Sequence, residues 1–143
     1  MNDLSIFSEQ EAAVAILFAC ALNKSKNLSQ AQIEHLSRML VLSSKFRESS
    51  LNELTMQALS LQSIHGSKVI IEKCSFFITD EFKETLFAMC CELMTNKGTV
   101  DDTDSEVLAM AALYLGLTVE NMKMMLTTYL IRNRWNVEII EQE

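Results

Sequence analysis

Four carboxylate side chains lie close together in one stretch of the sequence: Asp101, Asp102, Asp104 and Glu106. Carboxylate oxygens are the ligands that hard cations such as Ca²⁺ and Mg²⁺ prefer, so one interpretation is a divalent-cation site. The spacing is not that of an EF-hand, because no Gly occupies the sixth place of the loop and no Glu the twelfth. Carboxylates are also favoured in the first turn of a helix by its unpaired amides and its dipole. We favour helix capping and keep the cation site as the alternative.

A second group of residues suited to recognition lies near the end of the chain, where Arg132, Arg134 and Trp135 combine two cations with an aromatic side chain. Arg and Trp are enriched among the residues that dominate protein interfaces. These three residues could therefore anchor a partner protein. The simpler interpretation is a solvated helix end, because cations also suit the last turn of a helix.

The other reactive side chains form no recognisable motif. His35 and His65 are not arranged as H-x-x-x-H or H-E-x-x-H, so we expect them at the surface or at helix ends. The four cysteines fall inside apolar runs: Cys20, Cys74, Cys90 and Cys91. This placement predicts buried thiols in a reducing cytoplasm. No Gly-flanked serine and no phosphate-binding glycine loop is present, so a small enzyme with a site between helices is only the third alternative.

Composition limits the classes of protein that remain. With 12 Lys and Arg against 19 Asp and Glu, the net charge of −7 disfavours binding to nucleic acid. The N-terminal stretch has no basic region typical of a signal peptide, and the longest apolar run, residues 12–22, is shorter than the ~18 residues that span a bilayer. We therefore expect a cytoplasmic protein without a transmembrane segment. The mean hydropathy of +0.14 hints at exposed apolar surface and a homodimer.

The elements that must position these groups are all predicted to be helical. Pro is absent and Gly occurs three times in 143 residues, which favours helices in one domain. Ser8, Ser29 and Ser50 each begin a capping-box pattern, and residues 12–22 are apolar on every side, as in a central helix. Residues 67–78 contain β-favouring side chains, but we predict a helix because no other run could pair with a strand. We expect Thr79 or Asp80 to cap the next helix, Asp101 or a neighbour to cap the one after it, and Thr118 to cap the last.

The sequence also contains an internal repeat. A shift of 72 residues aligns Ser29, Gln32, Glu34 and Leu36 with Asp101, Asp104, Glu106 and Leu108. In both copies an apolar helix precedes a polar turn and a capped helix. We therefore predict an all-α, single-domain bundle of six to seven helices with a two-fold internal repeat, a core over residues 8–134, and halves at about 8–66 and 78–134.

These features resemble the tellurite-resistance TerB-like family. The resemblance lies in Asn96-Lys97-Gly98-Thr99-Val100-Asp101-Asp102-Thr103-Asp104, followed by Ala111-Ala112-Leu113-Tyr114-Leu115-Gly116-Leu117, and extends over about residues 9–130. It implies an all-helical domain of two similar halves, an acidic divalent-cation site for Ca²⁺ or Mg²⁺, and a role in the bacterial response to tellurite or other chemical stress.

Together these observations predict a non-enzymatic accessory or protein-interaction domain with no required cofactor. The partner is expected to be a protein, and the sequence does not identify it. The first alternative is a divalent-cation-binding domain that uses the acidic turn.

Overall fold

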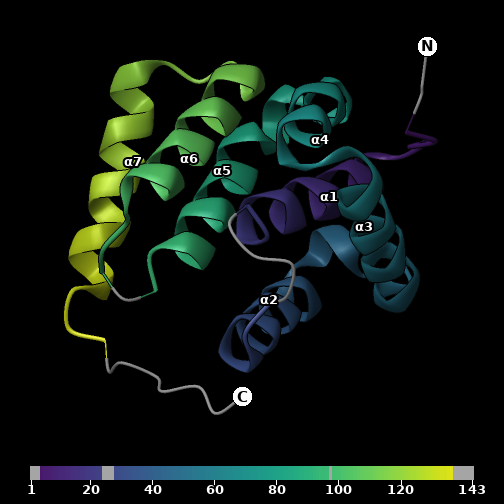
Figure 1. Cartoon of the computed structure of the whole chain (residues 1–143), viewed down its shortest axis with the longest axis horizontal. Helices are drawn as coiled ribbons and strands as arrows, with labels where there is room; N and C mark the ends of the chain where they lie inside the picture. The colour runs from purple at the N-terminus through teal and green to yellow at the C-terminus, as the bar shows by residue number, and fades with distance from the viewer. Residues whose placement is uncertain (1–3, 24–27, 97, 137–143) are drawn as a thin grey trace.

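The computed structural model describes residues 4–23, 28–96 and 98–136, and all regular elements within them are helices. In chain order they are α1 (Glu9–Ala21), α2 (Gln30–Leu42), the 3₁₀ turn η1 (Ser44–Phe46), α3 (Leu51–His65), α4 (Ser67–Cys74), the 3₁₀ turn η2 (Ser75–Phe77), α5 (Asp80–Met94), α6 (Asp102–Leu115) and α7 (Val119–Asn133) (Figure 1). The prediction of an all-α bundle is confirmed.

Helix α1 is the centre of the bundle, as its sequence predicts. It begins where the Ser8 hydroxyl accepts a hydrogen bond from the Glu11 amide at 3.1 Å, and residues 12–20 are all buried. The helix packs against α3, α4, α5 and α6. The Glu11 carboxylate also accepts a hydrogen bond from the side-chain amide of Gln57 at 2.8 Å, which links α1 to α3. An element without a polar face is therefore surrounded on its sides by other helices.

Side-chain caps fix the starts of most other helices. Ser29 and Gln32 form the complete capping box at α2, and Ser50 accepts from the Glu53 amide at α3. Helix α5 begins at Asp80 after the N-cap residue Thr79, as predicted, but the Thr79 side chain makes no capping bond.

The segment of ambiguous propensity is helical. Residues 67–74 form α4, and its β-branched residues Ile70 and Ile71 are fully buried. Gly66 allows the sharp change of direction from α3, because its backbone has φ +81° and ψ 167°, a conformation essentially restricted to glycine. Burial of this apolar face has overridden the local strand preference.

The second half of the chain builds the other side of the bundle. Helix α5 packs against α1, α2, α6 and α7, and α6 also contacts α1 and α4. Helix α7 lies at the edge in Figure 1, and its apolar residues are partly buried or exposed. Ser29 and Asp101 both act as N-caps, 72 positions apart. The two-fold internal repeat itself remains a prediction. No described helix is both long enough and apolar enough to cross a membrane.

Candidate functional site

The acidic turn begins helix α6. The carboxylate of Asp101 accepts a hydrogen bond from the Asp104 amide at 2.8 Å, while Asp102 and Asp104 occupy the first turn. This geometry satisfies an amide that has no partner within the helix and places negative charge at the positive end of its dipole. The capping role predicted for Asp101 is confirmed.

Two of the four acidic residues also line a cavity of about 300 Å³ between the two halves of the chain. Asp101 and Asp104 face it from α6, and Gln32 faces it from the first turn of α2. The residues that line the cavity do not include Asp102 or Glu106, which are exposed. Within the acidic turn, Asp101 and Asp104 therefore line a polar cavity, whereas Asp102 and Glu106 do not.

This arrangement does not assemble a cation site within the part of the chain that the structure describes. No three His, Cys, Asp or Glu side chains are grouped there so that they could hold one ion. Binding of Ca²⁺ or Mg²⁺ by Asp101, Asp102, Asp104 and Glu106 remains a prediction from the sequence.

The residues Arg132, Arg134 and Trp135, which we call the C-terminal patch, are all exposed. Trp135 is 88% exposed, the same fraction as the most exposed large apolar side chain elsewhere in the described chain. The patch spans the last turn of α7, which contains Arg132, and the residues directly after the helix. Its shape therefore depends on how the end of this helix is held.

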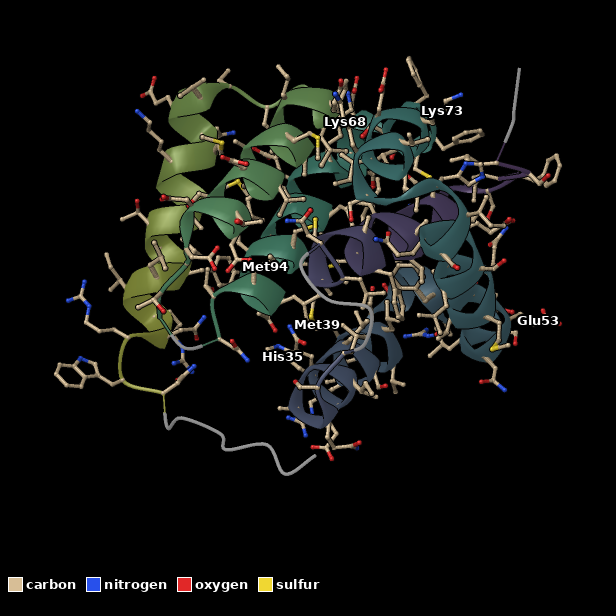
Figure 2. All side chains as sticks on the ribbon, in the orientation of Figure 1. His35, Met39, Glu53, Lys68, Lys73 and Met94 are labelled. Carbon is tan, nitrogen blue, oxygen red and sulfur yellow. The ribbon has the colours of Figure 1, made fainter. Side chains whose placement is uncertain are left out.

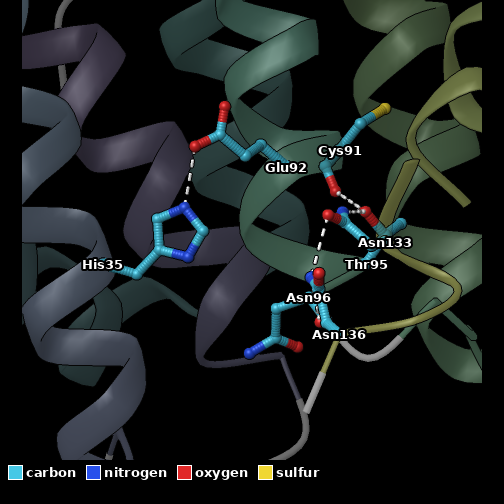
Figure 3. A network of polar contacts seen from close by, with 7 residues as sticks. All are labelled: His35, Cys91, Glu92, Thr95, Asn96, Asn133 and Asn136. Atoms are coloured by element: carbon cyan, nitrogen blue, oxygen red, sulfur yellow. Dashed lines mark hydrogen bonds and ion pairs between the residues drawn. The ribbon is translucent and has the colours of Figure 1, made fainter.

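A polar network holds the end of α7 against the end of α5 (Figure 3). Asn133 is buried, and its side-chain amide donates to the Thr95 hydroxyl at 3.0 Å. The Thr95 hydroxyl in turn donates to the backbone carbonyl of Cys91 at 2.6 Å. Because buried polar groups are costly when unpaired, this chain of bonds favours a single position for Asn133.

A second layer of contacts fixes the turn beyond the helix. The Asn136 side-chain amide donates to the Asn96 carbonyl at 2.9 Å and to the Asn133 side-chain oxygen at 3.0 Å. Gly98 lies against the same turn, since a Cβ at this position would be 2.6 Å from the Arg134 Cα. The turn that carries Arg134 and Trp135 is therefore attached at several points.

The sequence alone does not predict this network. The available signals were the two asparagines, Asn133 and Asn136, spaced three residues apart at the end of an amphipathic helix, and the glycine of the preceding polar turn. These signals do not predict Thr95 or Asn96 as the partners of the two asparagines, because the contacts join residues about 40 positions apart.

His35 also has an unexpected environment. Its Nε2 atom lies 2.7 Å from a carboxylate oxygen of Glu92 (Figure 3), and the two side chains are 30% and 40% exposed. The contact links α2 to α5, so His35 lies at the partly exposed surface with a partner that the sequence did not predict. Burial raises the pKa of Tyr129 on α7, and the negative charge of Glu92 raises it further. Glu92 therefore contacts His35 of α2 and, through its charge, affects Tyr129 of α7.

The cysteines are buried as predicted. All four are free thiols with no exposed surface. Burial raises the pKa of Cys74 and of Cys91 to about 12, and a hydrogen bond with Cys20, together with burial, raises the pKa of Cys90. Because the thiolate is the reactive form, these residues are poor nucleophiles in the folded protein.

A second polar cluster joins the starts of α1 and α5. A carboxylate oxygen of Glu9 accepts from the Thr79 amide and from its hydroxyl, both at 2.7 Å, and the other oxygen pairs with Lys45. The Lys45 ammonium also lies 4.7 Å from the centre of the Phe82 ring. These groups line a cavity of about 400 Å³. Since the charges of Glu9 and Lys45 offset each other, we assign the cluster a structural role.

Comparison of the chain with protein-family models, with curated proteins and with solved structures gives no match.

Proposed function

We propose that this protein is a non-enzymatic interaction module that binds a partner protein through the C-terminal patch. The observation that carries the proposal is the attachment of the turn at residues 133–136 to the end of α5. An exposed tryptophan beside two arginines is thereby presented on an ordered turn.

The ordered conformation of the C-terminal patch affects the free energy of binding a partner protein. A surface that is already held in one conformation loses less entropy when a partner binds. Trp and Arg are the side chains most often found at the energetic centre of an interface. Their placement on a fixed turn favours recognition over a solvated helix end.

The charges of the patch indicate the chemistry of the partner. Arg132 and Arg134 are exposed cations on a chain with a net charge of −7. They would be attracted to an acidic segment, with which Arg forms paired hydrogen bonds, while the Trp135 ring would cover an apolar side chain. We therefore propose a protein partner with an acidic and apolar contact segment.

We place this module, also as a proposal, among TerB-like domains that act in the bacterial cytoplasm during tellurite or other chemical stress. The support is the sequence resemblance over residues 9–130 together with the all-helical fold. The buried thiols support the non-enzymatic part of the proposal, because a redox or nucleophilic role would require an accessible thiolate.

The test compares partner capture by matched variants in cells of the source organism. We expect Trp135→Ala to reduce capture of specific proteins at least roughly tenfold, the effect of losing one interface residue of central importance. Val119→Ala is the control, since Val119 is a 64% exposed apolar residue at the other end of α7. Thermal melting should be nearly unchanged in both variants. Identical sets of captured proteins from all three chains would contradict the proposal.

A further inference from the structure

The outer face of α3 carries an apolar stripe without charge. Met56, Leu59 and Ile64 are 67%, 40% and 71% exposed, and the exposed residues between them are Ser60 and Ser63. Steps of three and four residues place these side chains on one side of the helix. We call these five residues the α3 stripe.

The α3 stripe differs from the exposed faces of the other outer helices. The solvent side of α2 includes Glu34 and Arg38, and that of α7 includes Glu120 and Lys123. Such charges keep a helix surface soluble and discourage association. The described α3 surface from Met56 to Ile64 exposes no such charge, and exposed apolar side chains grouped in this way are typical of an interface.

Charges of opposite sign lie at the two ends of the stripe. Glu53 is exposed in the first turn of α3, whereas the exposed Lys68 follows the C-terminal end of α3, in the first turn of α4. Figure 2 shows the two side chains at well-separated places on the surface. An antiparallel copy of the same surface would bring Glu53 of each chain towards Lys68 of the other.

We propose that the α3 stripe is a self-association surface, on which α3 of a second copy of this chain packs in the antiparallel direction about a two-fold axis near Ser60. Such an axis places Met56 of each chain opposite Ile64 of the other. It also directs Glu53 of each chain towards Lys68 of the other, so that every contact occurs twice, as in isologous dimers.

The small side chains favour close approach at the centre of this arrangement. Ser60 meets its own copy at the axis and Ser63 lies beside it, so the two helix backbones can come near each other while Met56 and Leu59 fill the space around them. The net charge of −7 opposes association, but at physiological salt repulsion between distant charges is screened beyond ~8 Å. The uncharged stripe keeps like charges away from the contact itself.

The size of the surface predicts a weak dimer. A helix of 15 residues is about 22 Å long, and one helix face covers less than the ~800 Å² per partner of a standard interface. We therefore expect a concentration-dependent dimer. This inference concerns a different surface from the C-terminal patch and does not rest on the proposed function.

The decisive experiment is disulfide trapping with Ser60→Cys. Two cysteines beside a two-fold axis can reach the short Cβ separation that a disulfide requires. Copper phenanthroline accepts the two electrons as the thiols lose their protons and the S–S bond forms. The four native cysteines are buried, so they do not compete in the folded protein. Thr127→Cys, on the exposed face of α7, is the matched control.

We expect Ser60→Cys to form covalent dimer at least roughly tenfold faster than Thr127→Cys, because association raises the effective thiol concentration. Sedimentation of the unmodified chain should show dimer at high concentration. Glu53→Lys should weaken this association about two- to fivefold, and the double variant Glu53→Lys with Lys68→Glu should restore it. Equal trapping rates for the two cysteine variants would overturn the proposal, as would a monomer at all concentrations or a charge reversal without effect.

Discussion

Glu9 shows how one buried carboxylate joins three parts of the chain. Its side chain is only 13% exposed. Burial alone would raise its pKa, but Lys45 and the two hydrogen bonds from Thr79 outweigh that effect and hold the pKa below the usual value of 4.5. The ionised carboxylate is therefore more favourable in the folded chain than in the unfolded one.

This pKa shift predicts a stability change in acid. A group with a lowered folded pKa stabilises the protein fully above its unfolded pKa, and this contribution is lost as the pH falls through the folded pKa. We expect Glu9→Gln to lower the free energy of unfolding by about 1–3 kcal/mol at pH 7 and by less at pH 3. Denaturant titrations between these pH values provide the measurement. Glu53→Gln, at an exposed position, is the control. A Glu9→Gln deficit that is equally large at pH 3 would exclude this assignment.

Two segments of backbone approach each other closely at Gly98. Its φ is +76°, and a Cβ would lie 2.6 Å from the Arg134 Cα and 2.9 Å from the Asn133 carbonyl oxygen. Gly116 has nearly the same φ, +81°, but its Cβ would meet only the flexible end of Lys83 at 3.6 Å. Alanine substitutions at the two glycines therefore separate the free-energy cost of a left-handed backbone from the free-energy cost of a steric clash.

We expect Gly116→Ala to cost about 1 kcal/mol, the left-handed penalty for a residue with a Cβ. Gly98→Ala should cost roughly 1–3 kcal/mol more, because the end of α7 must move away. Chemical denaturation of both variants measures the difference. Near-ultraviolet circular dichroism should report altered surroundings for Trp135 in Gly98→Ala alone. Equal losses in the two variants would mean that α7 does not approach residue 98 this closely.

The starts of helices are the elements that the sequence predicts best. Ser8, Ser29 and Asp101 all cap where they were expected to cap, because a capping bond joins residues only three positions apart. Thr79 is also the N-cap residue expected for α5, but its hydroxyl donates to Glu9, which is 70 positions away in the sequence, and does not cap the helix. His35 lies at the partly exposed surface, but its contact with Glu92 was not predicted because that partner lies 57 positions away. Local spacing cannot specify such contacts.

The start of α6 provides a test of the two interpretations of the acidic turn. Asn caps a helix about as well as Asp does, whereas Ala costs about 1 kcal/mol. We expect Asp101→Ala to lose about this amount and Asp101→Asn to lose clearly less. Addition of millimolar Ca²⁺ or Mg²⁺ should leave the melting temperature of every form unchanged. A cation-dependent rise that Asp101→Asn abolishes would instead establish the cation site, because ligand binding stabilises the folded state.

At the scale of the whole molecule, the helical class and the central position of α1 follow from composition and from an apolar run without a polar face. The contact between the ends of α5 and α7 does not follow from these features. It depends on the path of the chain through residues 95–98, where hydrogen bonds and close packing decide the geometry. The predicted burial of α1 and of the four cysteines is therefore confirmed, while the order in the C-terminal patch emerged only from the folded arrangement.

The four cysteines make the stability of the whole core measurable, because they lie on α1, α4 and α5 and none is exposed. We expect labelling of the native protein by a disulfide reagent to be slowed at least about 10³-fold relative to the unfolded chain, since an opening that exposes the core costs ~5 kcal/mol or more. Mass spectrometry of the labelled peptides should show Cys20, Cys90 and Cys91 reacting together. The Thr127→Cys thiol should react at once and serves as the internal standard. Early and separate labelling of Cys91 would show that α5 opens independently of α1, and that the core does not behave as one cooperative unit.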